Sequence, residues 1–276
     1  MSGHDSTLRL SAPDEASWID PGVLGRLHRI VVVPASGAWS AVPGHRLPPG
    51  ALLYGPESSG QRALVAWVAS QLDVPLVTVD LTTALRPSVI AMLAATRRAI
   101  FERNCVLLLD GLDAVAAHSE LRRHLGVYLD GLQTIDVEHR PLVMTTSDRP
   151  WALDPDWIGL GRLDRLVHVP PPQWDGRIAR LTALGERCGL HLGDSVQVLA
   201  AATAGWSGAD LDAVVAELVE RITSDSMPLV APAVASVVAD YAEHRVDWRH
   251  QIAPWGAAVA MRGRTDDLVG WLSAHG

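Results

Sequence analysis

The chain has 276 residues, 48% of them hydrophobic, which suffices for one large core with a smaller satellite or for two modest domains. A formal net charge of −8, without any long basic run, argues against nucleic acid and anionic membranes as partners. All 23 basic residues are arginine, so no lysine ammonium group is available to hold a phosphate.

The N-terminal segment and the cysteines bear on location. Residues 1–20 are predicted to be a polar, flexible lead-in and show no signal-peptide pattern, and no stretch approaches the roughly 18–20 apolar residues of a membrane span. Cys105 and Cys188 fit no metal-ligand spacing, and Cys105 opens an apolar run, which favours a buried free thiol in a reducing compartment. The sequence predicts a soluble, cytoplasmic protein.

The first part of the chain alternates apolar runs with helical patterns. Residues 22–33 carry a short helical pattern followed by an apolar run, and residues 34–49, rich in Pro, Gly, Ser and Ala, are predicted to be a loop. Strands are predicted at 51–54, 75–81, 105–109, 142–146 and 166–169, and helices at 62–72, 88–102 and 121–132. This alternation predicts an α/β fold with a parallel five-stranded sheet and helices on both faces.

After Pro170-Pro171-Pro172 the pattern becomes purely helical. Helices are predicted at 175–188, 196–203, 208–225 and 231–243. The tail from Trp248 to Gly276 is also helical in pattern but broken at Pro254. We therefore predict a lead-in (1–20), a large α/β domain (21–172), a small helical domain (173–246) and a helical tail (247–276).

A candidate phosphate loop follows the first strand and opens a helix. It reads Gly55, Pro56, Glu57, Ser58, Ser59, Gly60, Gln61, Arg62. In a P-loop, backbone N–H groups cradle phosphates, a lysine reaches the β and γ phosphates and a Ser or Thr hydroxyl binds Mg²⁺. Gln61 stands where the lysine belongs and Arg62 where the hydroxyl belongs. Two glycines at this spacing are more often only a turn.

Further segments extend the pattern in order along the chain. They are residues 47–56 leading into the loop, 106–113 as a Walker B strand, 129–132 in the next helix, 146–155 as a sensor 1 region, 161–165 as an arginine-finger segment and 205–211 opening a sensor 2 helix. Over roughly residues 20–245 the chain resembles the AAA family of P-loop ATPases. The resemblance implies a nucleotide-binding domain with a small helical lid, ATP or ADP as ligand, adenine contacts at Gly208 and Ala209, and assembly with AAA subunits as a homo- or hetero-oligomer.

The departures from the family pattern gather where the chemistry should be. Asp110 remains at the end of the Walker B strand, but Gly111 replaces the glutamate that activates water. Asp148 replaces the sensor 1 asparagine. Of two arginine-finger positions, one is Gly159 and only Arg162 remains, as a possible finger in trans. Residues 83–86 lack the pore aromatic of translocating relatives. These departures predict little or no hydrolysis in isolation.

Nucleotide binding is the more open question. Arg62 either folds back over the phosphates or points to solvent on the first turn of its helix, and Glu57 adds an unfavourable negative charge. We expect ATP or ADP to bind weakly and without firmly held Mg²⁺ at Asp110, or not at all.

Other candidate sites have simpler interpretations. The eleven histidines show no metal-binding spacing. Ser207 sits at a helix start, where serine is a good N-cap, and lacks the spacing of a hydrolase nucleophile. Tail tryptophans such as Trp248, Trp255 and Trp271 suit either an interaction surface or packing on the chain itself.

Three functions remain open from the sequence. The first is a non-hydrolysing regulatory or structural subunit of an AAA assembly. The second is an active but slow AAA ATPase that remodels proteins. The third is an adaptor that no longer uses nucleotide.

Overall fold

The structure is a computed structural model and describes residues 19–82, 104–116, 118–137, 139–159, 161–224 and 228–260. The predicted helix at 88–102, the loop at 83–86 and Trp271 lie outside the described residues. Most of the lead-in lies outside them as well.

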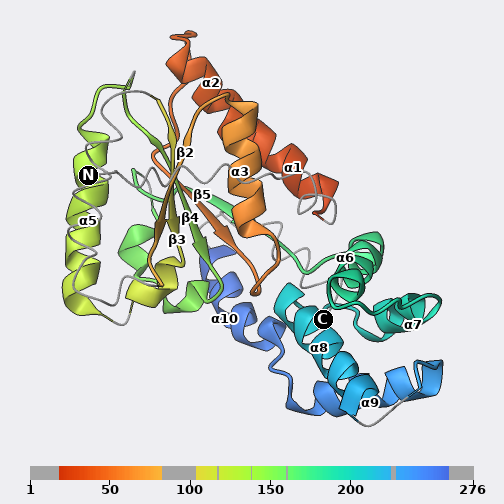
Figure 1. Cartoon of the computed structure of the whole chain (residues 1–276). Helices are drawn as coiled ribbons and strands as arrows, with labels where there is room; N and C mark the ends of the chain where they lie inside the picture. Colours follow the sequence, from red (N-terminus) through yellow and green to blue (C-terminus); the bar gives the residue numbers. More distant parts are fainter. Residues whose placement is uncertain are drawn as a thin grey trace, which may run out of the picture.

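A parallel sheet forms the centre of the large domain (Figure 1). Its five strands run in the order β2-β3-β4-β1-β5, and every neighbouring pair is parallel. The strands are β1 (Ala51–Tyr54), β2 (Leu76–Asp80), β3 (Val106–Asp110), β4 (Leu142–Ser147) and β5 (Arg165–His168). The predicted α/β fold is confirmed, with strand bounds shifted by a residue or so.

Helices cover both faces of the sheet because the central strands are apolar on both sides. In β1, Leu52 and Tyr54 join the core cluster beneath α5 (Ser119–Gln133), whereas Ala51 and Leu53 join the cluster beneath α3 (Gln61–Gln71). The buried strand residues alternate between these two clusters, as the period of two along a strand requires.

The N-terminal helical run differs from the prediction. Residues 34–49 were expected to be a loop, but α1 (Pro21–Leu27), the π-helix η1 (His28–Val32) and α2 (Val33–Trp39) follow one another without a break. The Val33 N–H donates to the carbonyl of His28, five residues back, and this wider turn accommodates Pro34, which has no N–H to donate. Burial of Val31 and Ala35 against α3 and the sheet stabilises the helix where local composition favours a loop.

The small domain is purely helical. It contains α6 (Trp174–Arg187), α7 (Ser195–Ala202), α8 (Gly208–Ser224) and α9 (Ala231–His244), which share a separate apolar core. Ser207 caps α8 as predicted: its Oγ accepts from the Asp210 N–H (3.0 Å), and the Ser207 N–H donates back to the Asp210 carboxylate (2.9 Å). The helical lid is confirmed, while the exact domain limits stay a prediction.

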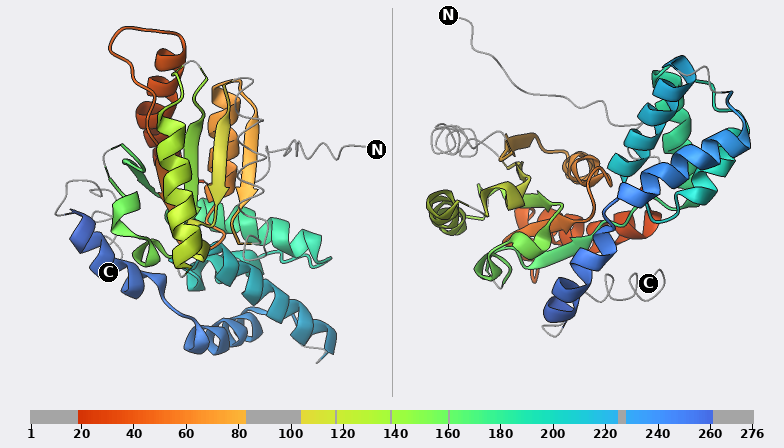
Figure 2. Two further views of the ribbon diagram at one scale, coloured as in Figure 1. Left: turned by 90° about the vertical axis from the view of Figure 1, so that its left-hand side faces the viewer. Right: turned by 90° about the horizontal axis from the view of Figure 1, so that it is seen from below.

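The last described helix, α10 (Trp248–Ala260), leaves the small domain and returns to the large one (Figure 2). The predicted break at Pro254 is wrong, because α10 continues through it. Pro254 is exposed, and the buried Ile252 anchors the helix in the core cluster beneath α5. Trp248 and Trp255 also pack against this cluster, so both pack on the chain itself.

The C-terminal ends of β1, β3 and β4 meet at one edge of the sheet. Three short helical turns, η2 (Leu112–Val115), η3 (Pro150–Ala152) and η4 (Pro155–Trp157), follow this edge. In a parallel α/β sheet, ligands bind at the carboxyl ends of the strands. Among the residues that the structure describes, no helix combines the length and hydropathy needed to cross a bilayer.

Candidate nucleotide-binding site

The phosphate loop connects β1 to α3 in a tight turn. Gly55 must be glycine, because a Cβ there would lie 2.0 Å from the carbonyl oxygen of Val169. Ser58 (φ +58°) and Gly60 (φ +95°) both take left-handed backbone angles, and Gly60 precedes the first turn of α3. The loop therefore keeps the backbone shape of a cradle despite its altered side chains.

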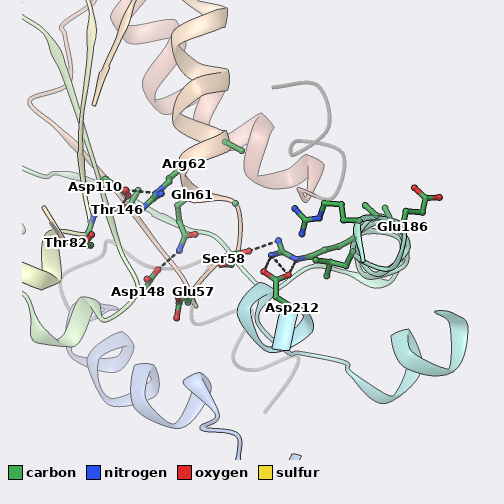
Figure 3. A pocket seen from close by; sticks show the side chains of 18 residues that line it. Glu57, Ser58, Gln61, Arg62, Thr82, Asp110, Thr146, Asp148, Glu186 and Asp212 are labelled. Carbon is green, nitrogen blue, oxygen red and sulfur yellow. Dashed lines mark hydrogen bonds and ion pairs between the residues drawn. The ribbon is translucent and has the colours of Figure 1, made fainter. Parts of the chain in front are cut away.

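Gln61 points back into the loop and holds it. Its Nε2 lies within donating distance of the carbonyls of Gly55 (3.1 Å) and Pro56 (3.3 Å) and of Asp148 Oδ1 (3.2 Å; Figure 3). The side chain is buried and carries no charge. Gln61 thus stabilises the loop but supplies no cation for a phosphate.

Arg62 takes a position that neither sequence-based alternative described. Its Nε lies 2.5 Å from Asp110 Oδ2, so the guanidinium pairs with the remaining Walker B carboxylate (Figure 3). The Arg62 side chain is 64% exposed, whereas that of Asp110 is only 6% exposed. Thr146 Oγ1 donates to the other carboxylate oxygen (2.6 Å) and accepts from the Gly111 N–H (2.8 Å). Each oxygen of Asp110 therefore has one partner within the site.

The backbone and surroundings of Gly111 favour glycine. Its backbone is left-handed (φ +73°), and a Cβ would lie 2.6 Å from Cγ2 of Thr82. The position next to Asp110 therefore cannot carry the family's glutamate without strain.

Asp148 is an unusual carboxyl group. Burial raises its pKa to about 7, with further raising by Asp113, Glu57 and Asp110, while Arg62 lowers it. The backbone carbonyl of Asp148 accepts from Trp248 Nε1 (2.7 Å), so α10 contacts the sensor 1 position directly. Near neutral pH this group is partly protonated.

Asp113 organises the backbone beside Asp148. It accepts hydrogen bonds from Ser147 Oγ (2.9 Å), the Asp148 N–H (3.2 Å) and Arg149 Nε (3.0 Å). Its place three residues after Asp110 is a sequence signal that could have identified it as part of the site.

The small domain lies in direct contact with the phosphate loop. The Ala209 N–H donates to the Glu57 carbonyl (3.3 Å), and a Cβ on Gly208 would lie 2.0 Å from the Ser58 carbonyl oxygen. Arg180 donates to the same Ser58 oxygen (3.0 Å) and pairs with Asp212. Gly208 and Ala209 thus lie at the loop, as the resemblance implies.

These groups line one cleft of about 1320 Å³ between the sheet edge and α6. Its lining brings together Glu57, Ser58, Gly60, Gln61, Arg62, Asp110, Gly111 and Asp148 from the predicted site. Arg180 and Asp212 also line it. No sequence pattern pointed to these two, because their contacts join residues that are distant along the chain.

Arg162 lies outside this cleft. Its guanidinium donates to both carboxylate oxygens of Asp130 (3.0 Å each) and to the carbonyl of Asp156 (3.1 Å). A Cβ on Gly159 would meet nothing within 4 Å, so the missing finger position is open. Arg162 therefore does not reach the nucleotide site of its own chain.

Comparison with known proteins places this geometry in a family. The sequence model of the ATPase family associated with various cellular activities (AAA) matches residues 51–171, which run from β1 past β5. ATP-dependent zinc metalloprotease FtsH 1 of Sorangium cellulosum is 32% identical over 189 residues, covering 63% of this chain and 30% of the relative. The FtsH metalloprotease of Aquifex aeolicus is 29% identical over 184 residues, covering 61% and 29%.

A third relative, the FtsH metalloprotease of Cutibacterium acnes, is 28% identical over 203 residues, covering 68% of this chain and 28% of the relative. The chain thus spans less than a third of the length of these relatives. The family match covers all five strands and the phosphate loop. Residues 51–171 match the AAA family of P-loop ATPases, and the chain resembles the AAA modules of FtsH-type proteases.

Proposed function

We propose that the chain is a nucleotide-binding AAA module with little or no hydrolysis of its own, acting in the cytoplasm as a regulatory or structural subunit of an AAA assembly. The observation that carries the proposal is the local structure at Gly111. The left-handed backbone and the nearby Thr82 methyl group would strain any side chain beside Asp110, and Gly111 itself offers no carboxylate.

Loss of hydrolysis follows from the groups that are absent. Phosphoryl transfer depends on positioning and on stabilising spread negative charge. General base assistance typically contributes ~10²–10⁴ in rate, and Gly111 offers no base. Gln61 is uncharged and is bound to loop carbonyls. Because such groups act together, their losses are not additive, but either one alone would make turnover slow.

Weak nucleotide binding is supported by the loop itself. The backbone cradle persists, and the Ser59 hydroxyl is buried with no hydrogen-bond partner among the described residues. Glu57 and Asp148 oppose a polyphosphate, because negative charges lie close to where it would bind. The proposed ligand is therefore ATP or ADP at low affinity.

The direct test is phosphate release by the purified chain, with Asp110→Asn as the control. We expect both proteins to release phosphate only at background rate. Saturating ADP should raise the melting temperature, because a ligand that binds only the folded state stabilises it. Rapid release that Asp110→Asn abolishes would contradict the proposal, and an unchanged melting temperature would favour the nucleotide-independent adaptor.

The regulatory part of the proposal rests on Arg162, which does not line its own cleft and pairs with Asp130. In a mixed complex with an active AAA subunit, Arg162→Ala should lower the partner's ATPase rate, since an arginine finger is worth ~10³–10⁵. Arg122→Ala, which removes a surface pair with Asp154 (3.6 Å), should leave the rate unchanged. An unaffected rate in an intact Arg162→Ala complex would remove this role.

One observation favours a slow ATPase as the second candidate. Asp148 is a carboxyl group in the cleft with a pKa of about 7, which suits a general base at neutral pH. If it acts so, any measurable phosphate release should rise as pH increases through about 7 and fall at least ~10-fold in Asp148→Asn. Release that is unchanged in this variant would exclude Asp148 as the base.

A further inference from the structure

The Arg62–Asp110 pair occupies the region where a P-loop ATPase holds its metal. In such enzymes Mg²⁺ is bound by the hydroxyl at the start of the loop helix and by the Walker B aspartate. Here the hydroxyl position is Arg62, and its guanidinium contacts the aspartate itself at 2.5 Å. Arg62 thus stands at one of the two metal-holding positions. Its guanidinium pairs with the residue at the other position, Asp110.

The residues present do not fit Mg²⁺. The ion demands near-octahedral oxygen coordination at ~2.0–2.1 Å. Each oxygen of Asp110 already has a partner, Arg62 on one and the Thr146 hydroxyl on the other, and the Arg62 partner is itself a cation. A metal ion beside Asp110 would also face the positive guanidinium at close range. Binding it would require breaking the pair.

The guanidinium retains donors for a ligand. Its Nε pairs with Asp110, and the side chain, on the cleft wall, is 64% exposed. The planar fork of arginine suits phosphate oxygens. Arg180 is less available, because it is already bound to Asp212 and to the Ser58 carbonyl.

We infer that Arg62 takes the place of the metal ion, so that this site binds metal-free nucleoside di- or triphosphate and Mg²⁺ does not assist binding. The inference rests on the proposed nucleotide-binding function and specifies the form of its ligand. Free Mg²⁺ should weaken binding or leave it unchanged, since it sequesters the nucleotide in solution.

The test is calorimetric titration of the purified chain with ADP, in excess EDTA and in excess Mg²⁺ at matched ionic strength. The wild-type Kd should be no lower in Mg²⁺ than in EDTA. Arg62→Thr restores the hydroxyl and frees Asp110, so its Kd should fall about tenfold on adding Mg²⁺, a change of ~1.4 kcal/mol. The matched control, Arg122→Thr, removes a paired arginine outside the cleft and should behave as wild type.

A second variant guards against misfolding of Arg62→Thr. In Asp110→Asn, Arg62 loses its anionic partner, while the oxygen of the new amide can still accept from the Thr146 hydroxyl. Metal-free ADP should then bind several-fold tighter, whereas a metal-dependent site would bind more weakly after the same change. Wild-type binding that requires Mg²⁺ overturns the inference but leaves the proposed function intact. Absence of ADP binding in both conditions overturns the proposed function and the inference with it.

Discussion

At the residue scale, the side chains that replace the family's catalytic groups have structural partners of their own. Gln61 ties the loop to Asp148, and Arg62 ties α3 to β3 through Asp110. These altered positions therefore lie in two pairs of interacting side chains rather than being isolated losses. Changing Arg62 alone would leave Asp110, only 6% exposed, without its cationic partner.

Asp148 should make stability depend on pH. Its folded pKa of about 7 lies above the ~3.9 of an unfolded aspartate, so the folded state binds more protons between these values and its stability falls as pH rises from about 4 to about 7. Asp148→Asn removes this titration and keeps an acceptor for Gln61. At pH 8 the free energy of unfolding of the variant should exceed that of the wild type by at most ~1.4 kcal/mol per unit of pKa shift. At pH 5 this difference should be smaller.

Urea unfolding of both proteins at the two pH values measures this difference. Asp136→Asn, at an exposed position, is the matched control and should show no such pH-dependent gain. A gain for Asp148→Asn that is equal at pH 5 and pH 8 would argue against a raised pKa.

Gly111→Glu should not restore hydrolysis. A left-handed backbone costs an L-residue ~1–2 kcal/mol, and the new Cβ would press on the Thr82 methyl group. We expect lower stability in urea and background phosphate release. Adding Thr82→Ser removes the methyl group but retains the hydroxyl that donates to Asp80, so it should recover the steric part of the loss. Strong ATPase activity in Gly111→Glu would show that the backbone can adapt.

At the element scale, α10 belongs to the large domain although it follows the small one. Ile252 is fully buried in the cluster beneath α5. Trp255 packs edge to face on Tyr54, the last residue of β1, with the ring centroids 5.0 Å apart. The Trp248 ring stacks on the ring of His168 in β5, with the ring centroids 5.8 Å apart. The helix therefore packs against the ends of β1 and β5 near the cleft.

Ile252→Ala should lower the free energy of unfolding by ~2–5 kcal/mol, because it leaves a cavity at a fully buried position. Val246→Ala just before the helix, where the residue is 68% exposed, should change stability by less than ~0.5 kcal/mol. Chemical denaturation measures both. A small loss for Ile252→Ala would mean that α10 is docked only loosely.

At the scale of the whole molecule, the cleft depends on the small domain resting on the phosphate loop. In this contact the Ala209 N–H donates to the Glu57 carbonyl, and the Arg180 guanidinium donates to the Ser58 carbonyl. Motion of the helical domain would therefore act on the loop directly, which couples the nucleotide state of the loop to the position of that domain.

Gly208→Ala should separate these parts, because its Cβ would lie 2.0 Å from the Ser58 carbonyl oxygen. We expect faster amide hydrogen exchange in residues 55–60 and weaker ADP binding. Gly25→Ala is the matched control in α1, where a Cβ meets nothing within 4 Å. It should leave exchange in the loop unchanged and stabilise its helix by up to ~1 kcal/mol. Unchanged loop exchange in Gly208→Ala would mean that the two domains are not coupled there.

The sequence alone predicted the sheet, the lid helices and the loop, because continuous apolar runs, helical spacing and glycine positions are local signals. It also placed Gln61 and Gly111 at the positions where the resemblance implies a lysine and a glutamate. It did not predict the helix through residues 34–39 or the continuation of α10 past Pro254. In both, burial against distant elements outweighs local propensity.

The tertiary structure alone decided what the replacement residues do. Arg62 meets Asp110, Gln61 meets Asp148 and Arg180 meets Ser58 only because the parallel strands end at one edge and the lid folds back over it. Charge pairing and burial act through space, so a chain read in order shows which groups are present but not which of them neutralise one another.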